Sequence, residues 1–152
     1  MTKFTADNLN RFLLVKLPSA YLSGIRVHSI SSTEATAKVR HRWINQNPFR
    51  SLYWATQGMA AELVAGLLLM NKIRNSGHRV SMLVVSQQGD FHKKATGRIT
   101  FVCSQGAVID RYLDRAIETG EGVTFTLDAE GFDEDQVCVS SFRFTWSIKL
   151  KK

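Results

Sequence analysis

The longest apolar stretch of the chain carries a single carboxylate in its middle, and this combination constrains the fold more than any other feature. Residues 47–73 read NPFRSLYWATQGMAAELVAGLLLMNKI, in which Glu62 is the one acidic residue. The stretch predicts a helix over residues 51–75 that is apolar on nearly every face, and such a helix is typically buried. A charge is costly to bury unless a partner stabilises it or chemistry uses it. The rest of the chain must therefore surround this helix and account for Glu62.

The two ends of the predicted helix carry residues with known terminal preferences. Ser51 is expected to be the N-cap, and Gly77 is placed to close the last turn. Glu62 and Gly66 interrupt the apolar run, which falls short of the roughly 18–20 residues of a membrane span. Small residues along the helix allow close approach of surrounding elements: Ala55, Gly58, Ala60, Ala61, Ala65 and Gly66.

The segments on either side of the long helix alternate between strand and helix patterns. Amphipathic spacing predicts a helix within residues 1–20, stopped by Pro18, and a short additional helix over residues 105–119. Strand patterns occupy residues 24–43 (as a hairpin), 79–94 and 97–103 (joined by a turn around residues 95–97), 122–129 and 137–150. The last strand alternates, with apolar residues on one face: Phe142, Phe144, Trp146, Ile148 and Leu150. The order predicts an α+β fold in one domain, residues 1–152. One largely antiparallel sheet of about six strands is expected to curl around the buried helix.

Charge and cysteine content argue against several functional classes. The net charge of +7 permits a polyanionic partner, but the basic residues are dispersed and do not alternate with aromatics, so we expect no nucleic-acid partner. Cys103 and Cys138 lie far apart, and we expect buried thiols rather than a disulfide. The histidines lack metal-ligand spacing, so no metal is expected. The N-terminal residues lack a signal-peptide pattern, and we expect a soluble, cytoplasmic protein.

Two segments resemble parts of the hotdog-fold thioesterase superfamily. They are NPFRSLYWATQGMAAELVAG, which runs from an Asn-led loop into the long helix, and DFHKKATGRITF, which resembles a later strand pair of the family. The resemblance covers residues 24–149 and points to the PaaI-like branch, and more closely to its DUF4442 relatives. It implies a hotdog fold, in which a curved antiparallel sheet wraps around a long central helix, and an activity on acyl thioesters.

The chain departs from the PaaI-like pattern at the start of the long helix. Those enzymes carry a His-Gly-Gly triplet there, with an acidic residue seven positions after the second Gly. Counting back from Glu62 places Tyr53, Trp54 and Ala55 at the three positions. Ala55 still supplies a backbone N–H at a helix N-terminus, where free donors stabilise developing negative charge. DUF4442 relatives commonly lack the triplet, so the departure favours that branch.

The resemblance also assigns roles to residues. Glu62 corresponds to the helix carboxylate, which acts on the thioester as nucleophile or as general base for water. The Ala55 N–H and Asn47 complete the expected catalytic group. The expected substrate-binding residues, which would form an apolar tunnel with a cationic mouth, are Tyr53, Trp54, Met59, Leu63, Phe91, Lys93 and Lys94. Ala55 and Glu62 are two turns, roughly 10 Å, apart on one helix. Two helices of a homodimer are therefore expected to build one site.

Each of these assignments has a structural alternative. Glu62 can hydrogen-bond at a dimer interface, Asn47 can serve only to orient its loop, and Lys93 and Lys94 can be solvated. The expected function is that of an acyl-CoA thioesterase-like hydrolase, with coenzyme A as part of the substrate and no separate cofactor. The alternative is a non-catalytic hotdog module that binds acyl-CoA or an acyl chain. An acyl-carrier protein as thioester carrier and a dimer of dimers as the assembly both stay open.

Overall fold

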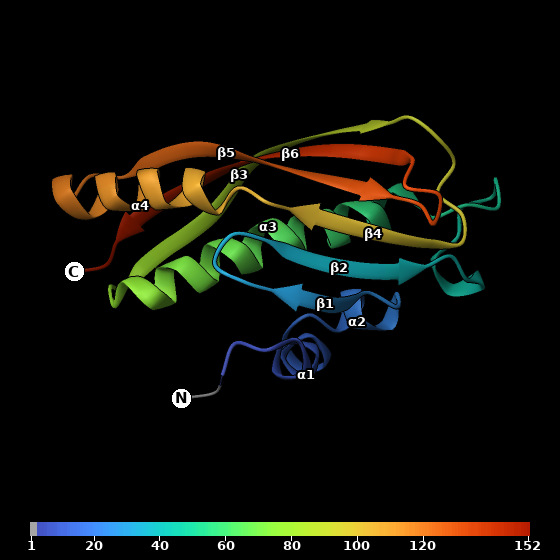
Figure 1. Cartoon of the computed structure of the whole chain (residues 1–152), viewed down its shortest axis with the longest axis horizontal. Coiled ribbons are helices and arrows are strands. Elements are labelled where there is room, and N and C mark those ends of the chain that lie inside the picture. The colour runs from blue at the N-terminus through green and yellow to red at the C-terminus, as the bar shows by residue number, and fades with distance from the viewer. Residues whose placement is uncertain (1–2) are drawn as a thin grey trace.

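The helix predicted from the apolar stretch forms the centre of the fold. In the computed structural model, which describes residues 3–152, α3 runs from Trp54 to Ser76 and a curved sheet passes over it (Figure 1). It ends at Gly77, whose φ of 73° is left-handed as a glycine C-cap requires. It begins three residues later than predicted, because Ser51 belongs to the preceding turn and does not cap the helix. No helix within residues 3–152 has the length and apolar character needed to cross a membrane.

Six antiparallel strands form one sheet, which confirms the predicted α+β class and the hotdog arrangement. They are β1 (Arg26–Ile30), β2 (Ala35–Arg40), β3 (Val80–Phe91), β4 (Arg98–Cys103), β5 (Val123–Phe132) and β6 (Cys138–Leu150). Their order across the sheet is β1-β2-β4-β5-β6-β3. Although β3 and β4 are consecutive in sequence, β5 and β6 lie between them. The segment 92–97 therefore crosses the sheet instead of closing a hairpin, and β1 and β3 form the two edges.

The core lies between the inner face of the sheet and α3. Strand β6 shows the predicted alternation, with Phe142, Phe144, Trp146 and Ile148 all buried. The ring of Trp146 packs directly against the helix at Gly66, where a Cβ would lie only 3.3 Å from the ring. The small residues predicted to permit close approach therefore do so here.

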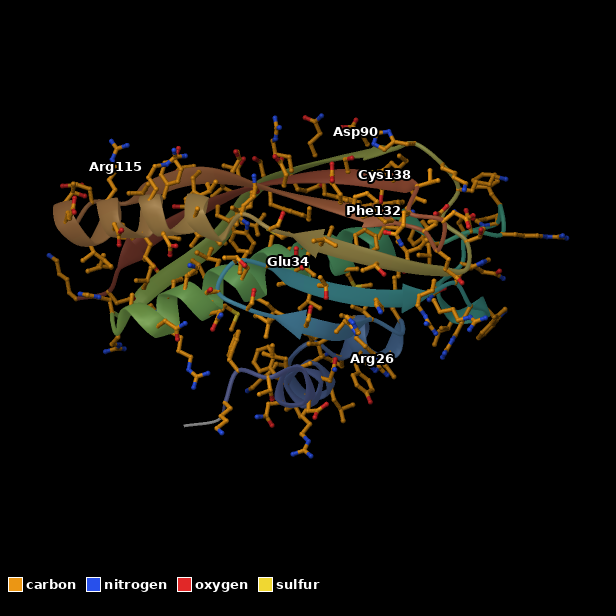
Figure 2. The ribbon with its side chains drawn as sticks, in the orientation of Figure 1. Arg26, Glu34, Asp90, Arg115, Phe132 and Cys138 are labelled. Carbon is orange, nitrogen blue, oxygen red and sulfur yellow. The ribbon has the colours of Figure 1, made fainter. Side chains whose placement is uncertain are left out.

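Two helices, α1 (Ala6–Lys16) and α2 (Pro18–Leu22), precede the sheet and lie beside β1 (Figure 1). The Asn10 side chain bonds the backbone of Val27, accepting from its N–H at 2.8 Å and donating to its carbonyl at 3.0 Å. Arg26 extends from β1 towards α2 (Figure 2), where it donates to the Tyr21 carbonyl at 2.7 Å and lies 3.5 Å from the centre of the Tyr21 ring. The edge of β1 is thus partly occupied by side chains of the chain itself.

A short 3-10 helix, η1 (Trp43–Asn45), and the helix α4 (Gly106–Thr119) complete the fold. The predicted hairpin is shorter than residues 24–43, since β2 ends at Arg40 and Trp43 is 84% exposed. Helix α4 packs on α3, β5 and β6, and its Tyr112 ring stacks on Phe125 with the ring centres 4.9 Å apart.

Both cysteines are free thiols. Cys103 is buried at the end of β4, and Cys138 is half-buried at the start of β6. Burial raises the pKa of the Cys103 thiol to about 11, so this thiol stays protonated at neutral pH and is a poor nucleophile.

Gly106→Ala is expected to destabilise the fold by about 1–3 kcal/mol, the usual cost of inserting an atom into a packed position. A Cβ at Gly106 would lie 2.5 Å from the Ser32 carbonyl oxygen and 2.8 Å from Thr33 Cα, and backbone atoms cannot swing aside as a side chain can. The free energy of unfolding in urea measures the effect. Gly122→Ala is the matched control, because a Cβ there meets nothing closer than 3.8 Å. Equal stability of the two variants would contradict this account.

Candidate functional site

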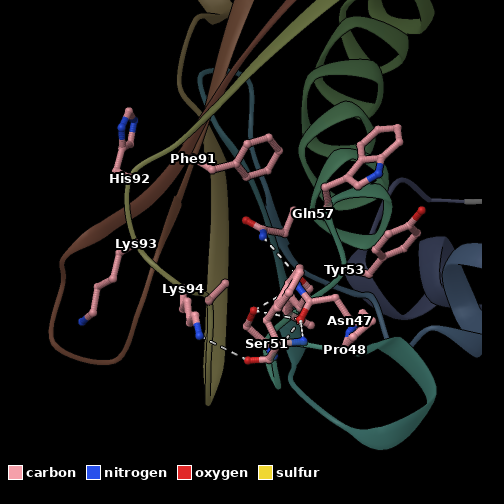
Figure 3. Close-up of a pocket in the computed structure, with 13 residues that line it drawn as sticks. Asn47, Pro48, Ser51, Tyr53, Gln57, Phe91, His92, Lys93 and Lys94 are labelled. Carbon is pink, nitrogen blue, oxygen red and sulfur yellow. Dashed lines mark hydrogen bonds between the residues drawn. The ribbon is translucent and has the colours of Figure 1, made fainter.

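A pocket of about 470 Å³ opens beside the first turn of α3 (Figure 3). Its walls are the loop that precedes α3, the start of α3 itself, and the segment that leaves the end of β3. Six of the residues named from the sequence line it: Asn47, Tyr53, Trp54, Phe91, Lys93 and Lys94. The fold therefore gathers the loop, helix-start and β3 residues of the predicted site around one cavity.

The Asn47 amide organises the loop that forms one wall of the pocket. Its Oδ1 accepts hydrogen bonds from the N–H groups of Phe49 at 2.9 Å and Ser51 at 3.2 Å. Its Nδ2 donates to the Ser51 hydroxyl at 3.0 Å and to the Leu52 carbonyl at 3.2 Å. The turn is tight enough to place Arg50 at φ 58°, which is uncommon for a residue other than glycine. Because its amide is engaged within its own loop, the geometry favours a positioning role for Asn47 over contact with a substrate.

The first turn of α3 presents unused backbone donors. Tyr53 is the N-cap, and its carbonyl accepts from the N–H groups of Thr56 at 3.0 Å and Gln57 at 3.3 Å. The N–H groups of Trp54 and Ala55 have no acceptor among residues 3–152. Free donors at a helix N-terminus, reinforced by the helix dipole, stabilise a developing oxyanion. Ala55 is half-buried and adjoins the pocket through its neighbour Trp54.

Glu62 lies apart from this pocket within one chain. Together with Met59 and Leu63 it lines a second, smaller pocket of about 220 Å³, whose opposite wall is residues 16–20, from the end of α1 into the first turn of α2. The tunnel predicted from Trp54, Met59, Leu63 and Phe91 is therefore two separate pockets in one chain.

The Glu62 carboxylate has no counterion in the described part of the chain. It forms neither an ion pair nor a hydrogen bond with any of residues 3–152, and its Oε1 lies against Gly66, 3.4 Å from where a Cβ would stand. Burial raises the pKa of Glu62 above its ordinary value. A partly buried, unpaired carboxylate is the environment in which general bases are found, although structural groups can share it.

The two lysines at the rim of the pocket differ in their partners. Lys93 forms an ion pair with Asp133 at 2.7 Å; this hydrogen bond raises the pKa of Lys93 and lowers that of Asp133. The Lys94 ammonium lies 3.5 Å from the Phe49 carbonyl and has no carboxylate partner among residues 3–152. Lys94 is therefore the better placed of the two to meet an anionic ligand.

Gln57 is a pocket residue that the sequence analysis missed. It is 4% exposed and lines the pocket from α3, with its Nε2 donating to the Leu52 carbonyl at 3.4 Å. Its Oε1 is buried and has no hydrogen-bond partner among residues 3–152. The available signal was an amide side chain within an apolar helix, three residues after Trp54 and therefore on the same side of the helix.

Comparisons with known proteins identify relatives of this chain. The family described as "Domain of unknown function (DUF4442)" matches residues 6–148. A Pseudomonas aeruginosa protein of unknown function, described as "Probable Thioesterase", is similar in structure with a TM-score of 0.82, 20% identity, and coverage of 95% of this chain and 96% of that chain. A Haemophilus influenzae thioesterase gives a TM-score of 0.75, 15% identity, and coverage of 98% and 93%. No curated protein sequence matches significantly.

A Staphylococcus aureus thioesterase is also similar, with a TM-score of 0.66, 14% identity, and coverage of 87% of this chain and 98% of that chain. Structures of that enzyme have been solved for a glutamine-to-alanine mutant and for a glutamate-to-alanine mutant whose altered positions are fifteen residues apart. At these identities the likenesses show the fold, which is the hotdog fold of thioesterase-like proteins.

Glu62→Gln is expected to raise the free energy of unfolding at about pH 8 and to change it little below about pH 4. Because burial raises the pKa of Glu62 in the folded protein, the ionised carboxylate destabilises the fold at high pH. This cost fades as the pH falls through the folded pKa and vanishes below the unfolded value near 4.5. Urea unfolding of both proteins across this range measures the difference. A difference that does not vary with pH would contradict the assignment of a raised pKa.

Proposed function

This chain belongs to the DUF4442 family, and from its candidate site we propose that it is a thioesterase that hydrolyses acyl-CoA or a related acyl thioester as a homodimer. The observation that carries the proposal is Glu62, a partly buried carboxylate that has no counterion among the described residues and whose pKa is raised by burial. A carboxylate whose pKa is raised in this way is a stronger base than a solvated one, which suits it to take a proton from water.

The proposed reaction uses two groups of this chain. The thioester carbonyl sits at the free N–H donors of Trp54 and Ala55, and Glu62 takes a proton from the attacking water. The C–O bond forms, the carbonyl oxygen becomes an oxyanion held by the N–H groups, and the C–S bond then breaks. The departing thiolate receives the proton, so that one water and one thioester give one carboxylic acid and one thiol. Direct attack by Glu62, followed by hydrolysis of the anhydride, gives the same products.

A dimer is required because one chain separates the two groups. Ala55 and Glu62 are roughly 10 Å apart along α3, and they adjoin different pockets. In the proposed dimer the Glu62 carboxylate of one chain faces the helix-start pocket of its partner. Antiparallel approach of two α3 helices across a twofold axis would form two such sites.

The free edge of β3 supports this mode of assembly. Strand β3 spans Val80–Phe91 and pairs only with β6, so its other edge is unpaired along its described length. Leu83 and Val85 on this strand are 64% and 50% exposed. A long apolar edge strand favours pairing with another chain. The opposite edge, β1, is partly occupied by Asn10.

The spacing of Asn47 and Glu62 is a second support. They are fifteen residues apart, as are the glutamine and glutamate positions altered in the Staphylococcus aureus thioesterase. Asn47 carries the same amide group as a glutamine on a shorter side chain. We assign Asn47 to holding the loop of the helix-start pocket, with Phe91 and Trp54 as apolar walls and Lys94 meeting phosphate groups of coenzyme A.

A non-catalytic module that binds acyl-CoA or an acyl chain is the second candidate. The observation that favours it is Trp54, which is 53% exposed and lines the pocket where PaaI-like enzymes carry glycine. A bulky ring at that position narrows the approach to the backbone donors. Such a module keeps the pocket and the dimer but turns over no thioester.

Thiol release from acyl-CoAs of short to long chain tests the enzyme against the module. We expect the wild type to release thiol, and Glu62→Gln to lower kcat by at least about 100-fold, the usual scale for loss of a general base. Glu121→Gln is the control. Glu121 is exposed in the turn after α4, and its substitution removes the same charge as Glu62→Gln does. Full turnover by folded Glu62→Gln would refute the role of Glu62, whereas binding without turnover by the wild type would favour the module.

Light scattering at micromolar concentration tests the assembly. We expect a dimer, and we expect the double variant Leu83→Lys, Val85→Lys to shift it towards monomer, because the substitutions place like charges on both copies of the β3 edge. Val15→Lys is the control; Val15 is 71% exposed on α1, which packs beside β1 at the opposite edge of the sheet. A monomeric wild type would count against a site shared between two chains.

A further inference from the structure

The helix-start pocket contains a buried hydrogen-bond acceptor that residues 3–152 leave unsatisfied. Gln57 is 4% exposed, and its Oε1 has no hydrogen-bond partner. Figure 3 shows its amide reaching from α3 towards the side of the pocket where Phe91 lies. An unpaired buried polar atom is costly, so native structures that keep one commonly use it to bind water or a ligand.

The surrounding hydrogen bonds fix which end of the Gln57 amide is free. Its Nε2 donates to the Leu52 carbonyl at 3.4 Å, and Asn47 donates to the same carbonyl at 3.2 Å. The Leu52 N–H in turn donates to the Ala95 carbonyl at 2.9 Å, which anchors this residue. If the Gln57 amide were turned over, two oxygens would face each other. The pocket therefore offers the ligand an acceptor, which selects for an O–H or N–H group.

We propose that Gln57 is a specificity residue that selects acyl groups bearing a hydroxyl, whose O–H donates to the Gln57 Oε1. This inference rests on the proposed thioesterase function, because it assigns the acyl part of the substrate to the helix-start pocket. Leu52, Phe91 and Ala95 supply apolar lining for the carbon skeleton of such a group. An unsubstituted acyl group of the same size would leave the acceptor unpaired.

The acyl end of the substrate, rather than coenzyme A, is the part that reaches Gln57. The exposed Lys93 and Lys94 lie at the rim, where the phosphates of coenzyme A keep contact with solvent. The free N–H of Trp54 marks the place of the thioester carbonyl, and Gln57 lies one turn further along the same side of α3. A substrate that enters from the rim therefore brings its carbonyl to Trp54 and its acyl group to Gln57.

Matched pairs of thioesters test the proposal. The probes are 3-hydroxybutyryl-CoA with butyryl-CoA, and 4-hydroxybenzoyl-CoA with benzoyl-CoA, which place the hydroxyl near to and far from the thioester. We expect the wild type to favour the hydroxylated member of at least one pair by roughly 10-fold or more in kcat/KM, on the scale of an unsatisfied buried acceptor. Gln57→Met removes the acceptor at similar length and should bring this ratio close to one.

Calorimetry with the matching non-hydrolysable thioethers measures the same ratio without turnover. Binding that favours the hydroxylated thioether in the wild type but not in Gln57→Met would support the role of Gln57 even if no thioester is hydrolysed. Hydrolysis without preference in either pair would overturn the selection of hydroxylated acyl groups and leave the thioesterase function standing. If Gln57→Met lost equal affinity for both members of a pair, Oε1 would contact the pantetheine amides common to all probes. That result would also overturn the selection of hydroxylated acyl groups. If Gln57→Met does not fold, the preference of the wild type for the hydroxylated probe decides the proposal: a preference supports it, and no preference overturns it.

Discussion

The contact between α3 and the inner face of the sheet is the constraint on which the rest of the structure depends. Trp146 packs on the helix where Gly66 leaves room, and a run of buried residues on α3 packs against the strands. A helix enclosed in this way has few places for a polar side chain. Gln57 and Glu62 occupy two such places, one at the open first turn and one facing the junction of α1 and α2. The packing that stabilises the core therefore also determines where chemistry can occur.

Much of the fold could be predicted from the sequence because its patterns are local. The apolar run of α3, the alternation of β6 and the glycine that ends α3 each depend on neighbouring residues. The start of α3 was placed wrongly because Ser51, a good N-cap by type, is bonded to Asn47 instead. The positions of β3 and β4 across the sheet follow from pairing between distant segments, which alternation within one strand cannot reveal.

Most residues of the candidate site could be predicted from the sequence, but which of them share a pocket could not. The family resemblance pointed to the helix-start residues and to Glu62, and the fold brings Asn47, Trp54 and Phe91 to one pocket. It places Glu62 in another, because two turns of helix separate it from the first turn. Gln57 was missed since its significance lies in burial without a partner for Oε1, a property that depends on the loop and β3 packing around it.

Burying Glu62 and the Gln57 Oε1 without partners costs free energy, and each cost is removed in a different way. The site is therefore coupled to the stability of the fold. Protonation removes the cost of burying the Glu62 charge, while only a hydrogen-bond donor can satisfy the Gln57 Oε1. A ligand that binds the folded chain and not the unfolded one stabilises it by mass action. A donor-bearing ligand at Gln57 adds to this the recovery of an unmet hydrogen bond. The same two side chains therefore link the stability of the fold to pH and to ligand binding.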